Sequence, residues 1–258
     1  MKKIAAVLAI ICAVTAAGCS NGDAGTASQT EAAETKEKVT LSLSDDDNTT
    51  ADSTDEALEY LDGVAPLFAN YLRERRTTPL TFETEITTEG AKWITKLYIE
   101  DADTCAMYSE DPDGGKTKVI YDGSMGYQID YNKKSVYAQN DLSAAEVKAI
   151  IEAQSLSTLS YSDVSNSTYV VDTAEYEGTE YDHVGITESG SGVSADNYFD
   201  KSTGKLAYSV SGGYATKVIT FENAITDSTV FDIPQDFEQK TFEDLVAEYN
   251  EANAEAAE

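Results

Sequence analysis

The chain is poor in the residues from which most catalytic and metal sites are built. Its 258 residues include one histidine, His183. A single histidine excludes a His-rich metal site, and any Ser-His-Asp triad would have to use His183. His183 lies in the alternating stretch E-Y-D-H-V-G-I, which is typical of an ordinary strand histidine. The sequence also lacks a P-loop, a strand-to-helix G-x-G-x-x-G and a nucleophile elbow. We therefore predict a protein that is not an enzyme and holds no cofactor or metal.

Positive charge is also scarce. The chain has 18 Lys and Arg residues against 47 Asp and Glu residues, a formal net charge of −29. Such a chain does not bind nucleic acid by neutralising phosphates, and anionic lipid headgroups repel it. The acidic run Asp45–Asp47 lacks the alternating ligands and the glycine of a calcium loop, so we interpret it as a solvated run. We expect no nucleic-acid partner and no membrane attachment through a basic patch.

The chain opens with a short hydrophobic segment. After the basic Met1–Lys3, about 14 apolar residues run from Ile4 to Ala17, fewer than the roughly 20 that a membrane-spanning helix needs. This length fits the hydrophobic region of a secretory signal instead. The protein is therefore expected to be exported.

A cysteine follows this segment directly. The residues before Cys19 are small: Ala16, Ala17 and Gly18. This step resembles the bacterial lipobox, in which the cysteine receives a diacylglycerol before the signal is cut, although lipoboxes often have Leu in place of Ala16. Two or more acyl chains anchor a protein stably. We predict a lipoprotein signal peptide over 1–18 and a membrane anchor at Cys19; the alternative is a plain secretory signal with a chance cysteine.

Cysteine is too scarce for an internal disulfide. Cys12 leaves with the signal and Cys19 carries the lipid, so that Cys105 alone remains of the three cysteines. Its apolar neighbours predict a buried core thiol. The folded domain therefore has to rest on its hydrophobic core.

The composition divides the mature chain into three parts. Residues 19–54 contain the lipidated cysteine and then a stretch without aromatic residues that is rich in Ser, Thr, Ala and acids, which predicts a flexible acidic tether. Residues 55–252 form a single domain, and 253–258 form a frayed tail of Ala and Glu. A long acidic tether is typical of surface lipoproteins of Gram-positive bacteria, so we place the protein at the outer face of the cell membrane.

Within the domain, three helices interrupt a long series of strands. Apolar residues at three- and four-residue spacing predict helices over Asp55–Arg75, Leu142–Ile151 and Thr241–Asn250. Pro66 predicts a kink or a break near Gly63. Between the helices, alternating segments separated by Gly and Asn turns predict an antiparallel meander of about 10–11 strands, the last of them over Val230–Pro234.

Several short motifs resemble those of the LolA/LolB-like family. These are the strand, Asp-Gly turn and aromatic strand over Ile120–Tyr131, the aromatic-Asp and Thr-Gly hairpin over Asn197–Val210, and V-I-T-F-E-N-A followed by V-F-D-I-P. The resemblance covers about Thr54 to Gln239. It implies an α+β fold in which a curved antiparallel sheet, a half-barrel packed with three helices, encloses an apolar cavity for acyl chains. The chain departs from the family's soluble shuttle in having its own anchor and tether.

The candidate ligand site follows from this resemblance. Trp93 and Leu97, on one face of their strand, are predicted to line the cavity together with Tyr127 and Ile129. Six tyrosines in consecutive strands have two interpretations, a tyrosine-lined cleft or half-buried cross-strand pairs. They are Tyr98, Tyr108, Tyr121, Tyr127, Tyr131 and Tyr137.

Two functions stay open from the sequence. In the first, the protein is a membrane-anchored extracytoplasmic lipoprotein that binds or carries an apolar or lipid ligand in its concave sheet. In the second, it is a non-enzymatic interaction or regulatory module at the cell surface, with a filled core. The cavity distinguishes them, because only the first function requires a hollow interior.

Overall fold

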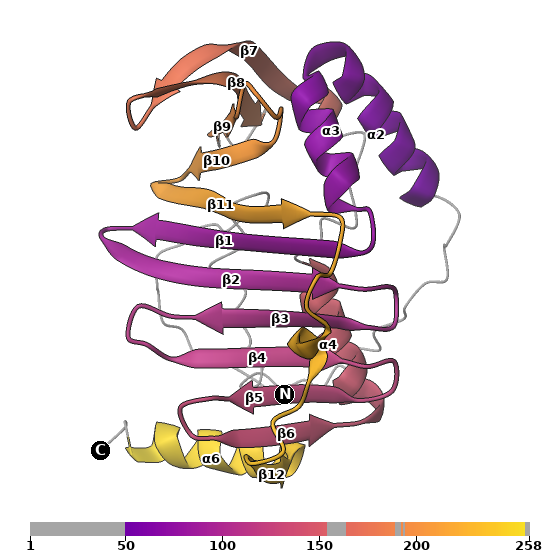
Figure 1. Ribbon diagram of the computed structural model, residues 1–258, viewed down its shortest axis with the longest axis vertical. Coiled ribbons are helices and arrows are strands. Elements are labelled where there is room, and N and C mark those ends of the chain that lie inside the picture. The colour runs from indigo at the N-terminus through magenta and orange to yellow at the C-terminus, as the bar shows by residue number, and fades with distance from the viewer. Residues whose placement is uncertain (1–49, 154–163, 189–191, 193, 256–258) are drawn as a thin grey trace, which may run out of the picture.

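The computed structural model describes residues 50–153, 164–188, 192 and 194–255 (Figure 1). The predicted signal peptide, the lipobox with Cys19 and most of the predicted tether lie outside these residues. The strands are β1 (Leu80–Thr88), β2 (Ala91–Ile99), β3 (Cys105–Glu110), β4 (Lys116–Tyr121), β5 (Gly126–Asp130), β6 (Ser135–Gln139), β7 (Ser167–Tyr176), β8 (Thr179–Glu188), β9 (Ser194–Phe199), β10 (Leu206–Ser211), β11 (Tyr214–Glu222) and β12 (Glu238–Thr241). The helices are α2 (Thr50–Val64), α3 (Pro66–Arg75), α4 (Asp141–Ala153) and α6 (Phe242–Glu255), with the 3-10 helix η1 (Ser228–Phe231).

All twelve strands belong to one sheet, in the order β12-β6-β5-β4-β3-β2-β1-β11-β10-β9-β8-β7. Among the described strands, only β12 and β6 pair in parallel. The antiparallel meander is therefore confirmed in its main part. The sheet is neither closed nor strongly curled, in contrast to the expected half-barrel of about 10–11 strands (Figure 1). The half-barrel expectation placed the helices inside a curve, whereas α2 and α3 pack on residues of β8–β10 and α4 packs on β3–β5, on the same face of the sheet.

The first predicted helix is two helices in the structure. Val64 ends α2 and Pro66 begins α3, because proline lacks the N–H and its ring clashes with the preceding turn. The predicted break is thus confirmed and falls at Ala65. The helical residues begin at Thr50, before the predicted domain start, and α6 continues to Glu255, into the predicted tail.

One face of the sheet, which we call the helical face, carries most of the core. Leu61 of α2 and Phe199 of β9 belong to one buried cluster, which also includes residues of α3. Val147 of α4 belongs to a second cluster with residues of β1–β4. Helix α4 lies so close to β5 that a Cβ on Gly126 would stand 2.9 Å from the Val147 side chain. The Cys105 thiol is 2% exposed in the second cluster, which confirms the predicted core thiol.

The opposite face, which we call the tyrosine face, carries the connection from β11 to β12. Strand β11 lies in the middle of the sheet and β12 at its edge, so residues 223–237, the crossing segment, run over the intervening strands (Figure 1). Phe231, Ile233 and Phe237 of this segment pack on a third buried cluster, formed by β3, β4, β5 and β6. The crossing also accounts for the single parallel pairing in the described sheet, because a long crossover and not a tight hairpin joins β12 to the rest of the sheet.

The prediction of a strand over Val230–Pro234 is therefore wrong. Its first residues belong to η1, and Asp227 caps this helix by accepting a hydrogen bond from the Thr229 N–H at 2.9 Å. The alternation of Phe231 and Ile233 that suggests a strand instead places both side chains on the third cluster. Alternating apolar residues indicate that one side of the segment is buried. A loop that crosses a sheet buries one side just as a strand does.

Helix α6 is joined to the sheet edge through Glu248. Its carboxylate accepts hydrogen bonds from Lys133 Nζ at 2.8 Å, Lys240 Nζ at 2.8 Å and the Tyr137 hydroxyl at 2.9 Å. These bonds, that from Lys133 foremost, lower the pKa of Glu248 to about 2 from the ordinary 4.5. A charged glutamate therefore stabilises the packing of α6.

Replacing Glu248 with glutamine is expected to lower the free energy of unfolding by about 1 kcal/mol at neutral pH, because solvent weakens these partly exposed pairs. The charged Glu248 contributes its full share to the free energy of unfolding above about pH 4.5, and this share is lost as the pH falls through about 2. The reason is that the carboxylate of the unfolded chain takes up its proton at a higher pH than that of the folded chain. Denaturant unfolding of both proteins along this pH range measures the effect. A difference that stays constant down to pH 2 would contradict it.

Candidate binding surface

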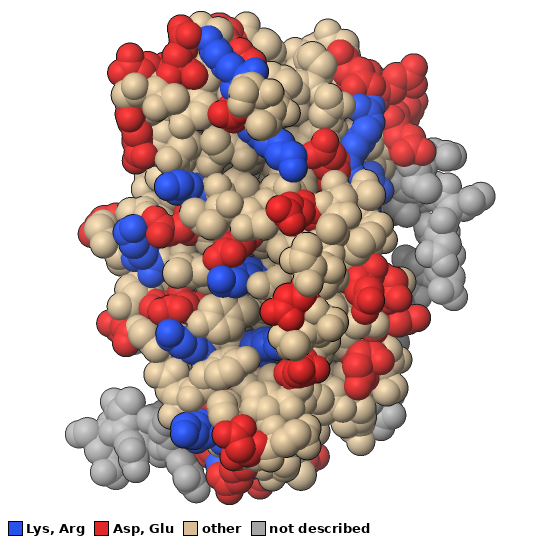
Figure 2. All heavy atoms as spheres, in the orientation of Figure 1, with Lys and Arg blue, Asp and Glu red and all other residues tan. Residues whose placement is uncertain are grey.

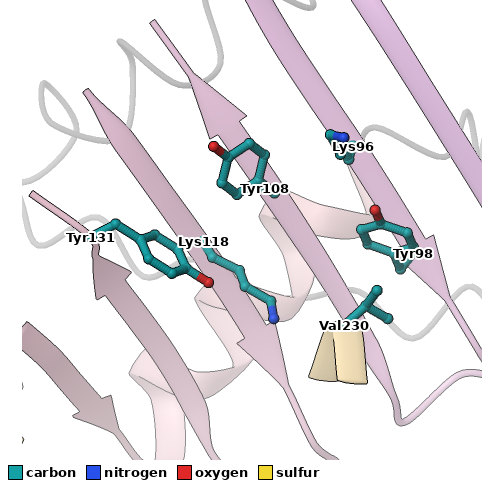
Figure 3. A pocket seen from close by; sticks show the side chains of 6 residues that line it. All are labelled: Lys96, Tyr98, Tyr108, Lys118, Tyr131 and Val230. Atoms are coloured by element: carbon teal, nitrogen blue, oxygen red, sulfur yellow. The ribbon is translucent and has the colours of Figure 1, made fainter. Parts of the chain in front are cut away.

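A pocket of about 220 Å³ opens on the tyrosine face, between the sheet and the crossing segment. Its lining residues are Lys96, Tyr98, Tyr108, Lys118, Tyr131 and Val230 (Figure 3). The strand register brings them together: Lys96 of β2 pairs with Tyr108 of β3, which pairs with Lys118 of β4. Paired residues stand on the same face of a sheet, so these three side chains form one row below Val230 of η1.

Aspartate-capped turns hold this register. In the turn between β3 and β4, Asp111 Oδ1 accepts from the N–H groups of Asp113 at 2.9 Å and Gly115 at 2.8 Å. In the turn between β4 and β5, Asp122 Oδ1 accepts from the N–H of Met125 at 2.9 Å. A slip of one residue would move Lys118 to the other face, so these turns determine the composition of the pocket.

Lys118 is the most unusual residue of the pocket. Its side chain is charged, yet the residue is only 7% exposed. Its Nζ donates to the Asp232 carbonyl oxygen at the long distance of 3.5 Å. Burial lowers the pKa of Lys118, and the nearby Asp232 and Asp227 carboxylates act against this. An ammonium has three N–H donors, so the position offers more hydrogen-bonding capacity than this one long bond uses.

The other polar groups of the pocket are a second ammonium and tyrosine hydroxyls. Lys96 Nζ lies 2.8 Å from Glu83 Oε1, and this pairing raises the pKa of Lys96. The Tyr108 hydroxyl donates to Glu110 at 3.1 Å. Burial, followed by this hydrogen bond, raises the pKa of Tyr108 to about 12. The Tyr108 hydroxyl therefore stays protonated at neutral pH, which makes it a hydrogen-bond donor.

A second feature of the same face is a cluster of four tyrosines, which we call the tyrosine cluster. Its members, one each from β7, β8, β9 and β10, are Tyr176, Tyr181, Tyr198 and Tyr208. The rings of Tyr176 and Tyr198 stack with centroids 4.7 Å apart, and Tyr208 lies 4.9 Å from Tyr176. All four are half-buried, and none belongs to the three core clusters of the described residues.

His183 lies beside this cluster. Its Nδ1 is 2.7 Å from Asp172 Oδ1 and its Nε2 is 3.0 Å from Asp196 Oδ1, while its ring packs 5.1 Å from that of Tyr198. Both ring nitrogens thus face carboxylates of the neighbouring strands β7 and β9. His183 lies on strand β8, as predicted, and its contacts link three strands.

The four residues predicted to line a cavity lie on different faces. Leu97 is buried in the core cluster of the helical face, and Trp93 stands on the same face of β2, four residues earlier along the strand. Ile129 and Tyr127 pack in the cluster beneath the crossing segment, on the tyrosine face. Trp93 and Leu97 therefore point to one side of the sheet, and Tyr127 and Ile129 point to the other. The four side chains do not line one cavity.

The tyrosines of β2–β6 divide between the two interpretations. Tyr98, Tyr108 and Tyr131 line the pocket, whereas Tyr121 and Tyr137 lie on the helical face, Tyr137 fully buried. Sequence reasoning missed Lys96 and Lys118 as well as the tyrosine cluster. The available signal was a lysine inside each of two otherwise apolar strand segments, T-K-L-Y-I and T-K-V-I-Y.

The structure has an α+β fold built on one open sheet. Helices cover one face of this sheet, and the other face carries the pocket and the tyrosine cluster. Among the described residues, no group of three or more His, Cys, Asp or Glu side chains is placed to hold a metal ion. Within the same residues, no helix combines the length and the apolar character of a membrane span.

No family model matches the chain, and no curated protein matches it. Among solved structures, it is similar to MucB in complex with MucA(peri), with 10% identity and a TM-score of 0.41 over 68% of this chain and 61% of that chain. An uncharacterized conserved protein from Thermus thermophilus matches with 10% identity and a TM-score of 0.40 over 68% and 97% of the two chains. The MucA/MucB complex of Pseudomonas aeruginosa matches with 11% identity and a TM-score of 0.41 over 71% and 62%.

The chain spans 61% to 66% of the length of the MucB chains. TM-scores of 0.40 and 0.41 are too low to assign a family, a ligand or a partner.

Proposed function

We propose that the protein is a non-enzymatic binding module, exported and anchored to the outer face of the cell membrane through lipid on Cys19, and that it binds a protein partner through the tyrosine cluster. The observation that carries this proposal is the position of the cluster. Its rings pack on one another across four strands, outside the hydrophobic core. Tyrosine supplies large, rigid contact area with a polar tip and is enriched in protein interfaces.

The surroundings of the cluster support a protein surface as partner. Val170 of β7 is 53% exposed, stands two residues from Asp172 and thus shares the face of the cluster. Figure 2 shows acidic and basic side chains interspersed with uncharged area on the side that carries the crossing segment. Mixed charge around aromatic residues is typical of the rim and centre of protein interfaces. This composition favours a protein over a nucleic acid or an anionic membrane.

Carriage of an apolar or lipid ligand is the alternative, and the geometry favours it less. The pocket of about 220 Å³ lies below the range of roughly 300–1,000 Å³ that is usual for small-molecule sites. Two of its six lining residues are lysines, which an acyl chain would desolvate without compensation. The helical face, on which the predicted cavity residues Trp93 and Leu97 lie, is covered by α2, α3 and α4, whose side chains pack in its buried clusters.

Site-directed photo-crosslinking in intact cells tests the binding module. A photoreactive residue in place of Val170 is expected to give one discrete protein adduct, and the same residue in place of the exposed Glu59 of α2 is expected to give none. Tyr208→Ser in the Val170 background is expected to reduce the adduct about tenfold, since aromatic anchors carry most of the energy of an interface. Equal adducts at both positions, or an adduct unaffected by Tyr208→Ser, would argue against the tyrosine cluster as the binding surface.

A further inference from the structure

We propose that the pocket between β2, β3, β4 and the crossing segment is a binding site for a small monocarboxylate with an apolar body. The site lies apart from the tyrosine cluster, so it goes beyond the proposed protein-binding function. Its central group is Lys118, whose side chain lines the pocket beside the Tyr131 hydroxyl (Figure 3).

The burial of Lys118 is the first argument. The ammonium of a 7% exposed lysine has lost most of its water, and desolvation is unfavourable unless other groups replace the water. The carbonyl oxygen of Asp232 replaces one contact, at 3.5 Å. The Asp227 and Asp232 carboxylates already lie near the ammonium, so what a carboxylate in the pocket would add is acceptors for the N–H groups that this one long bond does not use.

The rest of the lining fits the other parts of such a ligand. Figure 3 shows the Tyr131 hydroxyl turned toward the Lys118 side chain and the Tyr98 ring facing Val230. Burial raises the pKa values of Tyr98 and Tyr131, so that both hydroxyls remain donors for a carboxylate oxygen. The tyrosine rings and Val230 provide apolar walls for the remainder of the ligand.

The charges around the pocket limit the ligand to one negative charge. Glu83 and Glu110 stand on the sheet beside it, at 2.8 Å from Lys96 Nζ and 3.1 Å from the Tyr108 hydroxyl. Asp227 and Asp232 of the crossing segment lie near Lys118. These four carboxylates repel any anion in the pocket, and they repel a phosphate dianion about twice as strongly as a monocarboxylate. The volume of about 220 Å³ corresponds to roughly seven water molecules in the liquid, which suits a ligand of benzoate size.

The test is a titration of the soluble Cys19→Ala chain with benzoate, followed by ¹H–¹⁵N chemical shifts. We expect a dissociation constant of about 1 mM and shifts concentrated on β2, β3, β4 and η1. Acetate is expected to bind more weakly, and benzyl alcohol, which has the same ring without the charge, is expected not to bind. Binding of benzyl alcohol equal to that of benzoate would overturn the proposal, as would the absence of any benzoate-induced shift at the pocket.

Variants assign the role of Lys118. Lys118→Met keeps the length of the side chain without its charge and is expected to weaken benzoate binding about tenfold or more, with an unchanged or raised melting temperature because a buried charge is removed. Lys92→Met, at an exposed lysine on the same strand as Lys96, is the matched control and is expected to bind as the parent does. Tyr131→Phe provides a second variant with an intact ring and is expected to weaken binding several-fold. A lower melting temperature of Lys118→Met together with unchanged benzoate affinity would assign Lys118 to holding the crossing segment and overturn the proposal.

Two further ligands distinguish the source of the carboxylate. Inorganic phosphate is expected to bind more weakly than benzoate. A pentapeptide with a free C-terminal carboxylate is also expected to bind more weakly, because the pocket is too small for several residues. Tighter binding of either ligand than of benzoate would overturn the assignment to a small free monocarboxylate.

Discussion

Replacing Cys19 with alanine is expected to abolish the incorporation of labelled fatty acid into the protein. The anchor would consist of acyl chains on one sulfur, each buried methylene contributing about 0.8 kcal/mol. The full chain carries a formal net charge of −29 and is repelled by anionic headgroups. Labelling of cells that express either protein with fatty acid, followed by immunoprecipitation, measures the loss.

The matched control is Ser20→Ala, which alters the neighbouring residue and keeps the thiol. It is expected to remain in the membrane fraction and to incorporate labelled fatty acid, as the parent does. Labelled fatty acid on the Cys19→Ala protein, or none on the parent, would refute the anchor and would return the signal to the plain secretory interpretation.

Replacing Phe199 with alanine is expected to lower the free energy of unfolding by about 3–5 kcal/mol. The side chain is completely buried in the cluster that joins α2 and α3 to the sheet. Its removal takes away transfer free energy and leaves a cavity that the helices on one side and β9 on the other fill only in part. Natural domains are stable by about 5–15 kcal/mol, so the variant is expected to lose much of its stability near physiological temperature.

Denaturant unfolding monitored by circular dichroism measures this loss. Tyr214→Ala is the control, because its side chain is 40% exposed, and its cost is expected to be below about 1 kcal/mol. Equal destabilisation by the two substitutions would show that α2 and α3 do not pack on β9 as described.

The local elements were predictable from the sequence because their causes are local. Pro66 breaks the first helix through its own missing N–H. The Asp-Gly and Asn turns close hairpins between segments of period two, so that the strands from β1 to β6, and again from β7 to β11, pair in chain order. The curvature of the sheet is a property of all strands together, and no short pattern contains it.

The candidate site was less predictable, because it depends on register and on a long connection. Lys96, Tyr108 and Lys118 share a row only through the pairing of β2, β3 and β4. Val230 reaches them only because the crossing segment returns over the sheet. Trp93 and Ile129 both have the apolar character of cavity residues, yet they stand on opposite faces. Composition identifies such residues, while register decides which of them meet.

The central claim is that the core is filled and that binding takes place on the tyrosine face. Native mass spectrometry of the soluble Cys19→Ala chain, incubated with a diacyl phospholipid and then separated from excess lipid, tests this most directly. The account predicts the mass of the chain alone, because the helical face is occupied by α2, α3 and α4. A stoichiometric complex of one lipid per chain would contradict it and restore the carrier function.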